Sequence, residues 1–258
     1  MEGLTNIEQE RYIRHLMLDR IGRAGQQRIR DASVLVVGAG GLGCPVIQYL
    51  AAAGTGRLGI MDDDRVTNSN LQRQVLFGTK DVGRYKAIVV SEKIRSLNEF
   101  VQTEVIVERM LPENAVKVVN SFDMVVDCTD NIATRLLIND AAVLSDKPMI
   151  HGAVFKYEGA VAVFNYHGGP TYRCMYPFAR PETEPQPVLG IYNVLPGITG
   201  TLQANETLKV ILELDDVLSG KILLFNTLTN SFSINRIPVV PENRDKEQIK
   251  KLTQIKWP

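Results

Sequence analysis

Apolar and polar positions follow two different periods along the first 150 residues, and this pattern predicts a series of strands and helices. Short apolar runs rich in β-branched residues predict strands at 34–37, 57–61, 102–107, 124–128 and 148–150. The longer stretches between them predict helices at 43–53, 81–97, 112–120 and 131–145. Strands that alternate with helices form an open, doubly wound, mostly parallel sheet with helices on both faces. The sequence therefore predicts a Rossmann-like α/β fold.

The pattern changes near residue 152. Residues 159–166 and 222–237 predict additional antiparallel strands in the C-terminal region, and residues 198–214 predict a last helix. The proline-rich stretch 168–197 predicts a long crossover loop without regular structure. The tail, 241–258, mixes charged residues, and we expect it to pack loosely.

The N-terminal residues 7–30 predict a helical segment, which Gly22 and Gly25 interrupt. These boundaries divide the chain into three regions, namely residues 1–30, 31–152 and 153–258.

A glycine-rich turn follows the first predicted strand and opens the first helix of the parallel region. It contains Gly38, Gly40 and Gly43 in the spacing G-x-G-x-x-G. The first glycine permits the tight turn, the second lets backbone N–H groups approach a phosphate, and the third lets the helix pack close to the strand. Asp62 ends the next strand and can accept hydrogen bonds from ribose hydroxyls. The motif indicates a nucleotide but leaves open which one, so an NAD(P)- or FAD-binding protein remains an alternative.

Two cations and an amide close to the glycine-rich turn favour a triphosphate over a pyrophosphate bridge, and a group of carboxylates follows further along the chain. Arg73 can form a fork on phosphate oxygens, and Lys86 acts as a point charge. The string Asp127-Cys128-Thr129-Asp130-Asn131 follows a predicted parallel strand, at the edge where open α/β sheets bind ligands. A carboxylate there can hold Mg²⁺ between phosphates, and Asp130 is also a candidate N-cap of the helix 131–145.

Charge and cysteine content restrict the cellular location and the partners that we expect. Lys plus Arg and Asp plus Glu both total 29, and this neutral balance gives no attraction of the whole molecule to nucleic acid or to a membrane surface. Three cysteines cannot close a disulfide set, and we see neither a signal peptide nor a run long enough to span a membrane. We expect a cytoplasmic protein without nucleic-acid or membrane partners.

Several of these strings, taken together, resemble the MoeB/ThiF/HesA family of ubiquitin-activating-enzyme-like adenylyltransferases. The strings are Arg11-Tyr12-Ile13-Arg14-His15-Leu16, Gly38-Ala39-Gly40-Gly41-Leu42-Gly43, Asp62-Asp63-Asp64, Ser69-Asn70-Leu71-Gln72-Arg73-Gln74, Lys86 and Asp127-Cys128-Thr129-Asp130-Asn131. The resemblance covers roughly residues 5–237. It implies ATP- and Mg²⁺-dependent adenylylation of a carboxylate with release of pyrophosphate, usually at the C-terminal glycine of a ubiquitin-like sulfur carrier.

The resemblance also assigns site residues. It implies that Arg73, Lys86, Asp130 and, from a neighbouring subunit, Arg14 are catalytic, with Asp130 organising Mg²⁺. It implies a nucleotide site made of Gly38, Gly40, Gly41, Gly43, Asp62, Asp64, Asn70, Arg73, Gln74, Lys86, Asp130 and Asn131. Residues 1–30 would then mediate a homodimer with shared active sites, residues 31–152 would bind ATP, and residues 153–258 would form the substrate side.

The chain departs from the family at its cysteines. The first zinc pair of the family should read Cys-Tyr-Arg-Cys, but residues 171–174 read Thr-Tyr-Arg-Cys, and no cysteine follows to residue 258. We therefore predict no zinc site, Cys174 as a small buried residue, and Cys44 and Cys128 as packing residues. The family's loop cysteine would lie near 186–188 and is absent. We expect the reaction to stop at the acyl-adenylate, with any thioester formed on a partner.

These losses leave the owner of the carboxylate open. The first reading is the ubiquitin-like carrier. The alternative is a small-molecule carboxylate, such as the guanylylpyridinol precursor of the Fe-hydrogenase cofactor that a related methanogen enzyme activates. A non-catalytic scaffold is a further alternative. Four aromatic residues could stack on a planar substrate or pack in the core, namely Phe155, Tyr157, Tyr172 and Tyr176.

Overall fold

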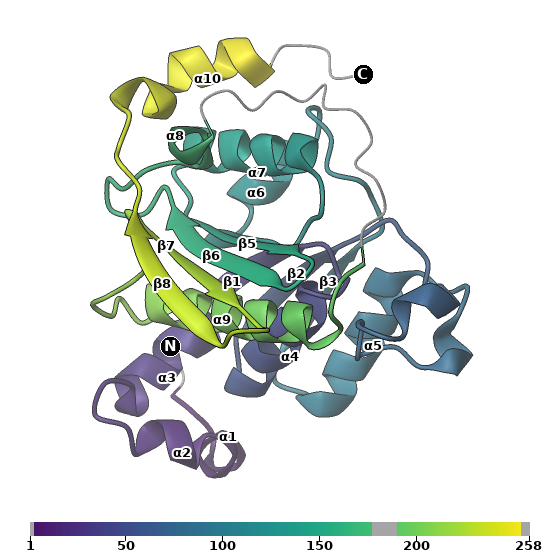
Figure 1. The fold of residues 1–258 in the computed structure, drawn as a ribbon. Coiled ribbons are helices and arrows are strands. Elements are labelled where there is room, and N and C mark those ends of the chain that lie inside the picture. The colour runs from purple at the N-terminus through teal and green to yellow at the C-terminus, as the bar shows by residue number, and fades with distance from the viewer. Residues whose placement is uncertain (1–2, 177–189, 254–258) are drawn as a thin grey trace.

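One mixed β-sheet organises the molecule in the computed structural model, which describes residues 3–176 and 190–253 (Figure 1). Across these residues the strand order is β3-β2-β1-β4-β5-β6-β7-β8. The strands are β1 Ser33–Val37, β2 Arg57–Met61, β3 Gln102–Ile106, β4 Met124–Asp127, β5 Met149–Phe155, β6 Glu158–Phe164, β7 Lys221–Asn226 and β8 Ser231–Arg236. Neighbours from β3 to β5 are parallel, and those from β5 to β8 are antiparallel.

Helices cover both faces of the parallel strands. The helices of the described residues are α1 Asn6–Arg11, α2 Ile13–Leu16, α3 Gly22–Asp31, α4 Gly43–Ala53, α5 Lys86–Leu97, α6 Ala115–Asn120, α7 Ile132–Leu144, α8 Tyr172–Met175, α9 Val194–Ile211 and α10 Lys246–Thr253. Helices α6, α7 and α8 lie on one face of the sheet, and α4, α5 and α9 lie on the other (Figure 1).

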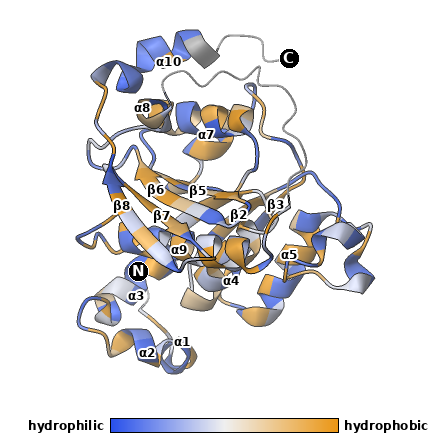
Figure 2. Ribbon diagram, in the orientation of Figure 1, coloured by the Kyte–Doolittle hydropathy of each residue, from blue (hydrophilic) through white to orange (hydrophobic). Residues whose placement is uncertain are grey.

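The central strand β1 shows why the apolar runs of the sequence form this sheet. Leu35 and Val37 pack in the core beneath α6 and α7, whereas Val34 and Val36 pack in the core against α4 and α9. A strand that is buried on both faces needs apolar side chains at successive positions, and β1 has them. The apolar surfaces of the helices turn towards the sheet, and their polar surfaces turn outward (Figure 2). The predicted Rossmann-like α/β fold with antiparallel C-terminal strands is confirmed.

Several predicted helices have different limits, and the expected helix 112–120 begins at Ala115. The expected helix 81–97 begins at Lys86, because residues 79–81 form a short 3-10 turn and Tyr85 is extended and pairs with Arg65. The expected helix 198–214 runs from Val194 to Ile211. The stretch 168–197 is therefore not free of regular structure, since it contains α8 and the first turn of α9; its residues 177–189 lie outside the described residues.

The prediction that the tail packs loosely is wrong for residues 241–253. A 3-10 turn, Pro241–Arg244, leads into α10, which lies against α7 (Figure 1). The side chain of Ile249 on α10 is fully buried. Asn243 Nδ2 donates to the carbonyl of Arg173 at 3.2 Å. This segment forms an amphipathic helix, and its many charged residues obscured the apolar position in the sequence pattern.

In the part of the chain that the structure describes, no helix is long and apolar enough to cross a membrane.

The packing of α10 can be tested by removing its buried side chain. Ile249→Ala should lower the free energy of unfolding by about 2–4 kcal/mol, because it leaves a cavity beneath α10. Lys251→Ala on the exposed side of the same helix is the control and should change it by less than about 0.5 kcal/mol. Urea unfolding of the full chain measures both. Equal, small losses would contradict the docking of α10.

Candidate active site

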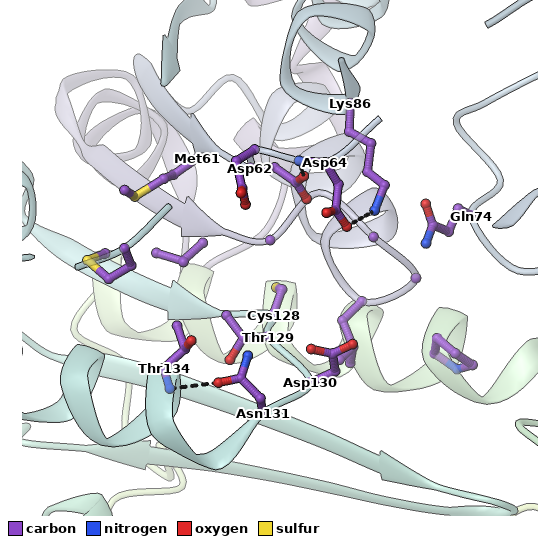
Figure 3. Close-up of a pocket in the computed structure, with 18 of the residues that line it drawn as sticks. Met61, Asp62, Asp64, Gln74, Lys86, Cys128, Thr129, Asp130, Asn131 and Thr134 are labelled. Atoms are coloured by element: carbon purple, nitrogen blue, oxygen red, sulfur yellow. Dashed lines mark hydrogen bonds and ion pairs between the residues drawn. The ribbon is translucent and has the colours of Figure 1, made fainter. Parts of the chain in front are cut away.

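A pocket lies at the carboxyl ends of the parallel strands, where β1, β2 and β4 end side by side (Figure 3). Open α/β sheets bind ligands at this edge. The residues that line it include Gly38, Gly40, Gly41, Asp62, Asp63, Asp64, Arg73, Gln74, Lys86, Glu108, Arg109, Met110, Thr129, Asp130, Asn131, Thr134, Ile191 and Pro196. Most of the predicted nucleotide residues therefore lie together.

Gly38 and Gly43 have the steric roles that the sequence predicts. Gly38 has φ +96°, and a Cβ there would lie 2.7 Å from the Cys128 carbonyl oxygen. A Cβ at Gly43 would lie 2.0 Å from the Gly38 carbonyl oxygen, so Gly43 serves the packing of α4 and does not line the pocket. Gly40 and Gly41 expose backbone to the pocket just before the N-terminus of α4, where the helix has partial positive charge. This cradle suits a phosphate group.

Asp62 joins the end of β2 to the glycine turn. Its two carboxylate oxygens accept the backbone N–H groups of Ala39, at 2.7 Å, and Asp64, at 2.9 Å. Burial raises the pKa of this carboxyl group, while the charge of Lys86 and the two N–H groups oppose the shift. Each oxygen keeps capacity for a further hydrogen bond, so Asp62 can still accept ribose hydroxyls.

Lys86 is buried at the start of α5, and its ammonium group forms an ion pair with Asp64 at 2.7 Å (Figure 3). The N–H of Lys86 also donates to the Asp64 carbonyl. Asp64 thus holds the cation at the pocket edge. Nearby, Gln74 is buried and its Oε1 has no hydrogen-bond partner within the described residues. An unsatisfied buried polar atom in a pocket indicates that a ligand or water belongs there.

The segment 68–74 brings one predicted phosphate contact to the pocket and leaves another outside it. Arg73 lines the pocket and donates to the Ser69 carbonyl at 3.0 Å. Asn70 does not line the pocket; its Oδ1 accepts the N–H of Thr67, and its carbonyl accepts the N–H groups of Arg73 and Gln74. In this chain Asn70 shapes the turn that carries Arg73.

Asp130 does not cap α7. Asn131 is the N-cap, because its Oδ1 accepts the N–H of Thr134 at 2.8 Å (Figure 3). The prediction of an N-cap at Asp130 is therefore wrong. The Asp130 carboxylate remains exposed at the pocket wall, where it is available to a cation.

Asp127, which precedes this turn, is fully buried beneath it. Its oxygens accept hydrogen bonds from Thr129 and from His151 Nδ1, the latter at 2.7 Å. Burial would raise the pKa of Asp127, but the hydrogen bond from His151, the charge of Arg135 and the hydrogen bond from Thr129 lower it overall. Burial lowers the pKa of His151 and thereby favours the neutral ring. Sequence reasoning missed His151, since a histidine in an apolar strand has no motif of its own.

The loop after β3 was also missed. Glu108, Arg109 and Met110 line the pocket, and Arg109 Nε lies 4.0 Å from the Asp63 carboxylate. They follow a parallel strand directly, and that position was the one available signal.

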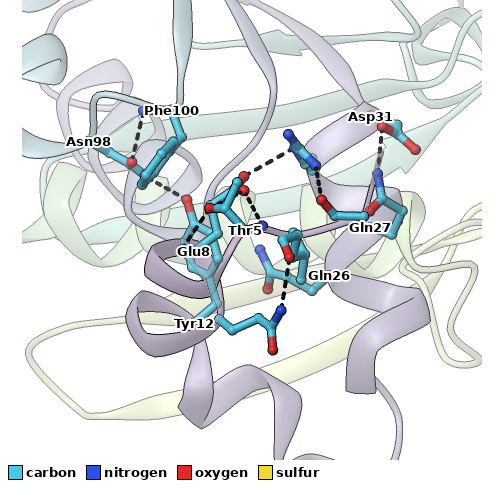
Figure 4. Close-up of polar contacts among 12 residues, drawn as sticks. Thr5, Glu8, Tyr12, Gln26, Gln27, Asp31, Asn98 and Phe100 are labelled. Carbon is cyan, nitrogen blue, oxygen red and sulfur yellow. Dashed lines mark hydrogen bonds and ion pairs between the residues drawn. The ribbon is translucent and has the colours of Figure 1, made fainter. Parts of the chain in front are cut away.

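Arg14 is exposed on α2 and does not line the pocket of its own chain. The segment around it is anchored by buried polar contacts (Figure 4). Glu8 forms a capping box with Thr5 and an ion pair with Arg30 at 3.1 Å. Tyr12 accepts a hydrogen bond from Asn98 Nδ2 at 2.9 Å.

All three cysteines are buried, as predicted. Burial raises the pKa of Cys44 to about 12 and that of Cys128 well above its usual range, so neither is a thiolate at neutral pH. The Cys174 sulfur accepts the N–H groups of Thr171, at 3.3 Å, and Val240, at 3.4 Å.

In residues 3–176 and 190–253 no three His, Cys, Asp or Glu side chains are grouped so that they could hold a metal ion. The absence of zinc stays a prediction. The positions expected for the loop cysteine, 186–188, lie outside the described residues.

The four aromatic residues that could stack on a planar substrate lie in different environments. Tyr172 is buried against His151 and Phe164 in the core. Phe155, Tyr157 and Tyr176 are exposed.

The buried His151 predicts a pH dependence of stability. The unfolded chain binds a proton on this residue below about pH 6.5, whereas the folded chain does so only at lower pH. The free energy of unfolding should therefore fall as pH is lowered through this range, by at most about 1.4 kcal/mol per pH unit from this residue.

His151→Asn should remove that contribution, and His167→Asn, at an exposed histidine, should retain it. Urea unfolding between about pH 7.5 and 5.5 measures the difference. Identical slopes for the wild-type chain and His151→Asn would contradict a neutral buried ring.

Known proteins share this chain's sequence and fold. The ThiF family matches residues 12–248. A sulfur carrier protein adenylyltransferase of Thermus thermophilus is 45% identical over 247 residues, which cover 92% of this chain and 91% of that protein. Adenylyltransferase and sulfurtransferase MOCS3 of Xenopus laevis is 43% identical over 89% of this chain, which spans 51% of that relative.

Solved structures add the fold. Escherichia coli MccB with MccA-N7isoASN has a TM-score of 0.81 and 20% identity, covering 90% of this chain and 73% of that one. PaaA has a TM-score of 0.78 and 22% identity, covering 92% and 76% of the two chains. With the family match over nearly the whole chain, these findings show that the chain belongs to the ThiF family and is an adenylyltransferase.

Proposed function

We propose that this chain uses ATP and Mg²⁺ to adenylylate the C-terminal carboxylate of a ubiquitin-like sulfur-carrier protein, with release of pyrophosphate. One pocket contains the glycine cradle, two cations and the exposed Asp130 carboxylate, and this observation carries the proposal. The relative from Thermus thermophilus, named for a sulfur carrier protein, supports the choice of substrate.

ATP fits the groups at the pocket. The backbone at Gly40 and Gly41 can receive a phosphate, Asp62 can accept ribose hydroxyls, and Arg73 and Lys86 can neutralise phosphate charge. Lys86 reaches a phosphate by exchanging its ion pair with Asp64 for one with the ligand.

Mg²⁺ also fits, because it usually takes one or two carboxylates together with phosphate oxygens and water. Asp130 supplies an exposed carboxylate, which is not engaged in capping α7 because Asn131 is the N-cap. The described residues need not form a metal site of their own for this ion, since ATP brings the remaining oxygens. When bound, the cation neutralises phosphate charge.

The reaction needs positioning more than proton transfer. A carboxylate oxygen of the substrate attacks the α-phosphorus and forms the acyl–phosphate bond. The bond from that phosphorus to the bridging oxygen of the β-phosphate breaks, and its electron pair leaves with pyrophosphate. Arg73 and Lys86 stabilise the charge that moves onto the leaving group.

The acyl group then passes to a partner. The sequence contains three cysteines, all of them buried, so this chain presents no exposed thiol to receive it. A separate thioester-forming protein or sulfur donor is the expected acceptor. The alternative substrate, a small planar carboxylate, has less support, because Tyr172 is part of the core and the exposed Phe155, Tyr157 and Tyr176 do not line the pocket.

A homodimer would complete the site. Arg14 is flanked on the surface by the exposed apolar side chains of Ile13, Met17 and Leu18. An apolar groove beside the pocket is lined by residues that include Gly41, Arg73, Val75, Val194 and Ile198. Seating the α2 segment of a second copy in this groove would bring its Arg14 towards the phosphates.

Asp130→Asn should lower carboxylate-dependent pyrophosphate–ATP exchange by about 100-fold or more, because the amide lacks the negative charge that holds Mg²⁺. Asp31→Asn, an exposed substitution at the end of α3, is the matched control and should retain exchange. A carrier ending in Gly-Gly is the first substrate, and small aromatic carboxylates are the comparison.

Exchange that survives in Asp130→Asn would refute the assignment of Mg²⁺. Exchange that only a small carboxylate stimulates would replace the protein substrate with the alternative.

Arg14→Ala and Asp130→Ala should each abolish exchange alone and restore some of it when the two proteins are unfolded, mixed and refolded together. Each mixed dimer would then hold one intact site, because Arg14 would come from the chain that lacks Asp130. Separately refolded samples combined afterwards are the control. Absence of recovery in verified mixed dimers would contradict shared sites.

A further inference from the structure

A network of buried polar groups lies directly behind the turn that presents Asp130. At its centre is the Asp127 carboxylate, which is fully buried and does not line the pocket. Asp127 Oδ1 accepts the N–H of Thr129 at 3.0 Å and its hydroxyl at 2.6 Å. Asp127 Oδ2 accepts His151 Nδ1 at 2.7 Å. Asp127 therefore supports the backbone of this turn and does not line the pocket.

Arg135 holds the same turn from the other side. Its guanidinium donates to the Thr129 carbonyl at 2.8 Å, so Thr129 is fixed through its N–H, its hydroxyl and its carbonyl. Arg135 Nε lies 3.8 Å from Asp127 Oδ2 and has no hydrogen-bond partner in the described chain. Because Asp130 follows Thr129 directly, these contacts set the direction in which the Asp130 side chain leaves the backbone.

Helix α9 adds a third support. Gln203 Nε2 donates to the Asp127 carbonyl at 2.7 Å. The Gln203 side chain occupies the place that a Cβ at Gly152 would take, with its Cδ 2.3 Å away. Asp127 and His151 are direct partners in the pairing of β4 with β5. The end of β4 is thus fixed by β5, α7 and α9 together.

Stability alone does not explain this arrangement. Removing ionised and polar groups from water is costly, and apolar residues of similar volume often stabilise a core as well or better. Binding geometry does explain it, since a ligand group must be held within about 0.5 Å of its productive position by the residues behind it.

We propose that His151 and Asp127, together with Arg135, are positioning residues that hold the Thr129–Asp130 turn so that Asp130 meets Mg²⁺ on ATP. This inference rests on the proposed function. His151 donates from Nδ1, and the neutral ring keeps Asp127 ionised and aimed at Thr129. None of the three residues lines the pocket.

The test replaces the hydrogen bond while preserving the packing. His151→Leu removes the donor, and His151→Asn keeps an N–H close to the place of Nδ1. Phe164→Leu is the control, because Phe164 is a fully buried ring neighbour of His151 with no polar contact to Asp127. Calorimetric titration of ATP at several Mg²⁺ concentrations gives the Mg²⁺ concentration for half-maximal binding, a readout that does not depend on turnover.

His151→Leu should raise that concentration by about tenfold or more, while His151→Asn and Phe164→Leu stay within about threefold of the wild-type chain. Phe164→Leu should nevertheless lower the melting temperature, which separates a loss of packing from a loss of positioning. An unchanged Mg²⁺ requirement in folded His151→Leu, or an equal shift in Phe164→Leu, would overturn the inference.

The histidine tautomer gives a second readout. The chain has three histidines, so the imidazole nitrogen spectrum of the full chain is simple to assign with the His151→Asn variant. We expect His151 to be protonated on Nδ1 alone, and an Nε2–H tautomer would refute the bond to Asp127. Failure of the wild-type chain to bind ATP with Mg²⁺ would instead refute the proposed function and this inference with it. Wild-type binding with an unshifted His151→Leu would refute the inference only.

Discussion

The close approach of two strand-end turns determines the rest of the site. Gly38 passes the Cys128 carbonyl oxygen at a distance that no Cβ would permit, and Gly43 passes the Gly38 carbonyl oxygen more closely still. The turn from β1 to α4 and the turn from β4 to α7 therefore share one pocket, although about 90 residues separate them in the chain. The backbone of the glycine turn and the Asp130 carboxylate can line the same pocket because Gly38, where the two turns meet, lacks a side chain.

The sequence pattern predicted the fold well where a single physical rule governs it. Strands that are buried on both faces require continuous apolar runs, and β1, β2 and β4 have them. The pattern failed where several local states compete. Asp130 and Asn131 are both good N-caps, and only the course of the backbone decides that Asn131 accepts the N–H of Thr134. The prediction for the C-terminal tail failed because one buried residue, Ile249, among many charged residues gives little periodic signal.

Most of the residues predicted to form the nucleotide site line the pocket together, but their pairing was not predicted. Motifs located Lys86, Asp64 and Asp130, yet the ion pair between Lys86 and Asp64 depends on how α5 begins beside β2. The bond between Asp127 and His151 depends on the register of β4 with β5, which the sequence does not state. Asn70 shows the converse case, in which a residue carried over from the family shapes a turn in this chain and does not line the pocket.

Residues 171–174, where the family pattern would place zinc cysteines, and the buried polar network around Asp127 belong to the same part of the core. Where the family pattern would place a zinc cysteine, Thr171 donates its N–H to the Cys174 sulfur, and Val240 donates to that sulfur from the C-terminal segment. Arg173, between them, forms two hydrogen bonds of 2.7 Å with the buried carboxylate of Asp140 on α7. Tyr172, the remaining residue of this string, packs against His151. Hydrogen bonds and apolar packing thus join α8, α7 and the chain before α10 in one unit. The core that supports Asp130 from behind is the same core that anchors the C-terminal segment, so changes in that segment can reach the pocket through Tyr172 and His151 without touching a ligand.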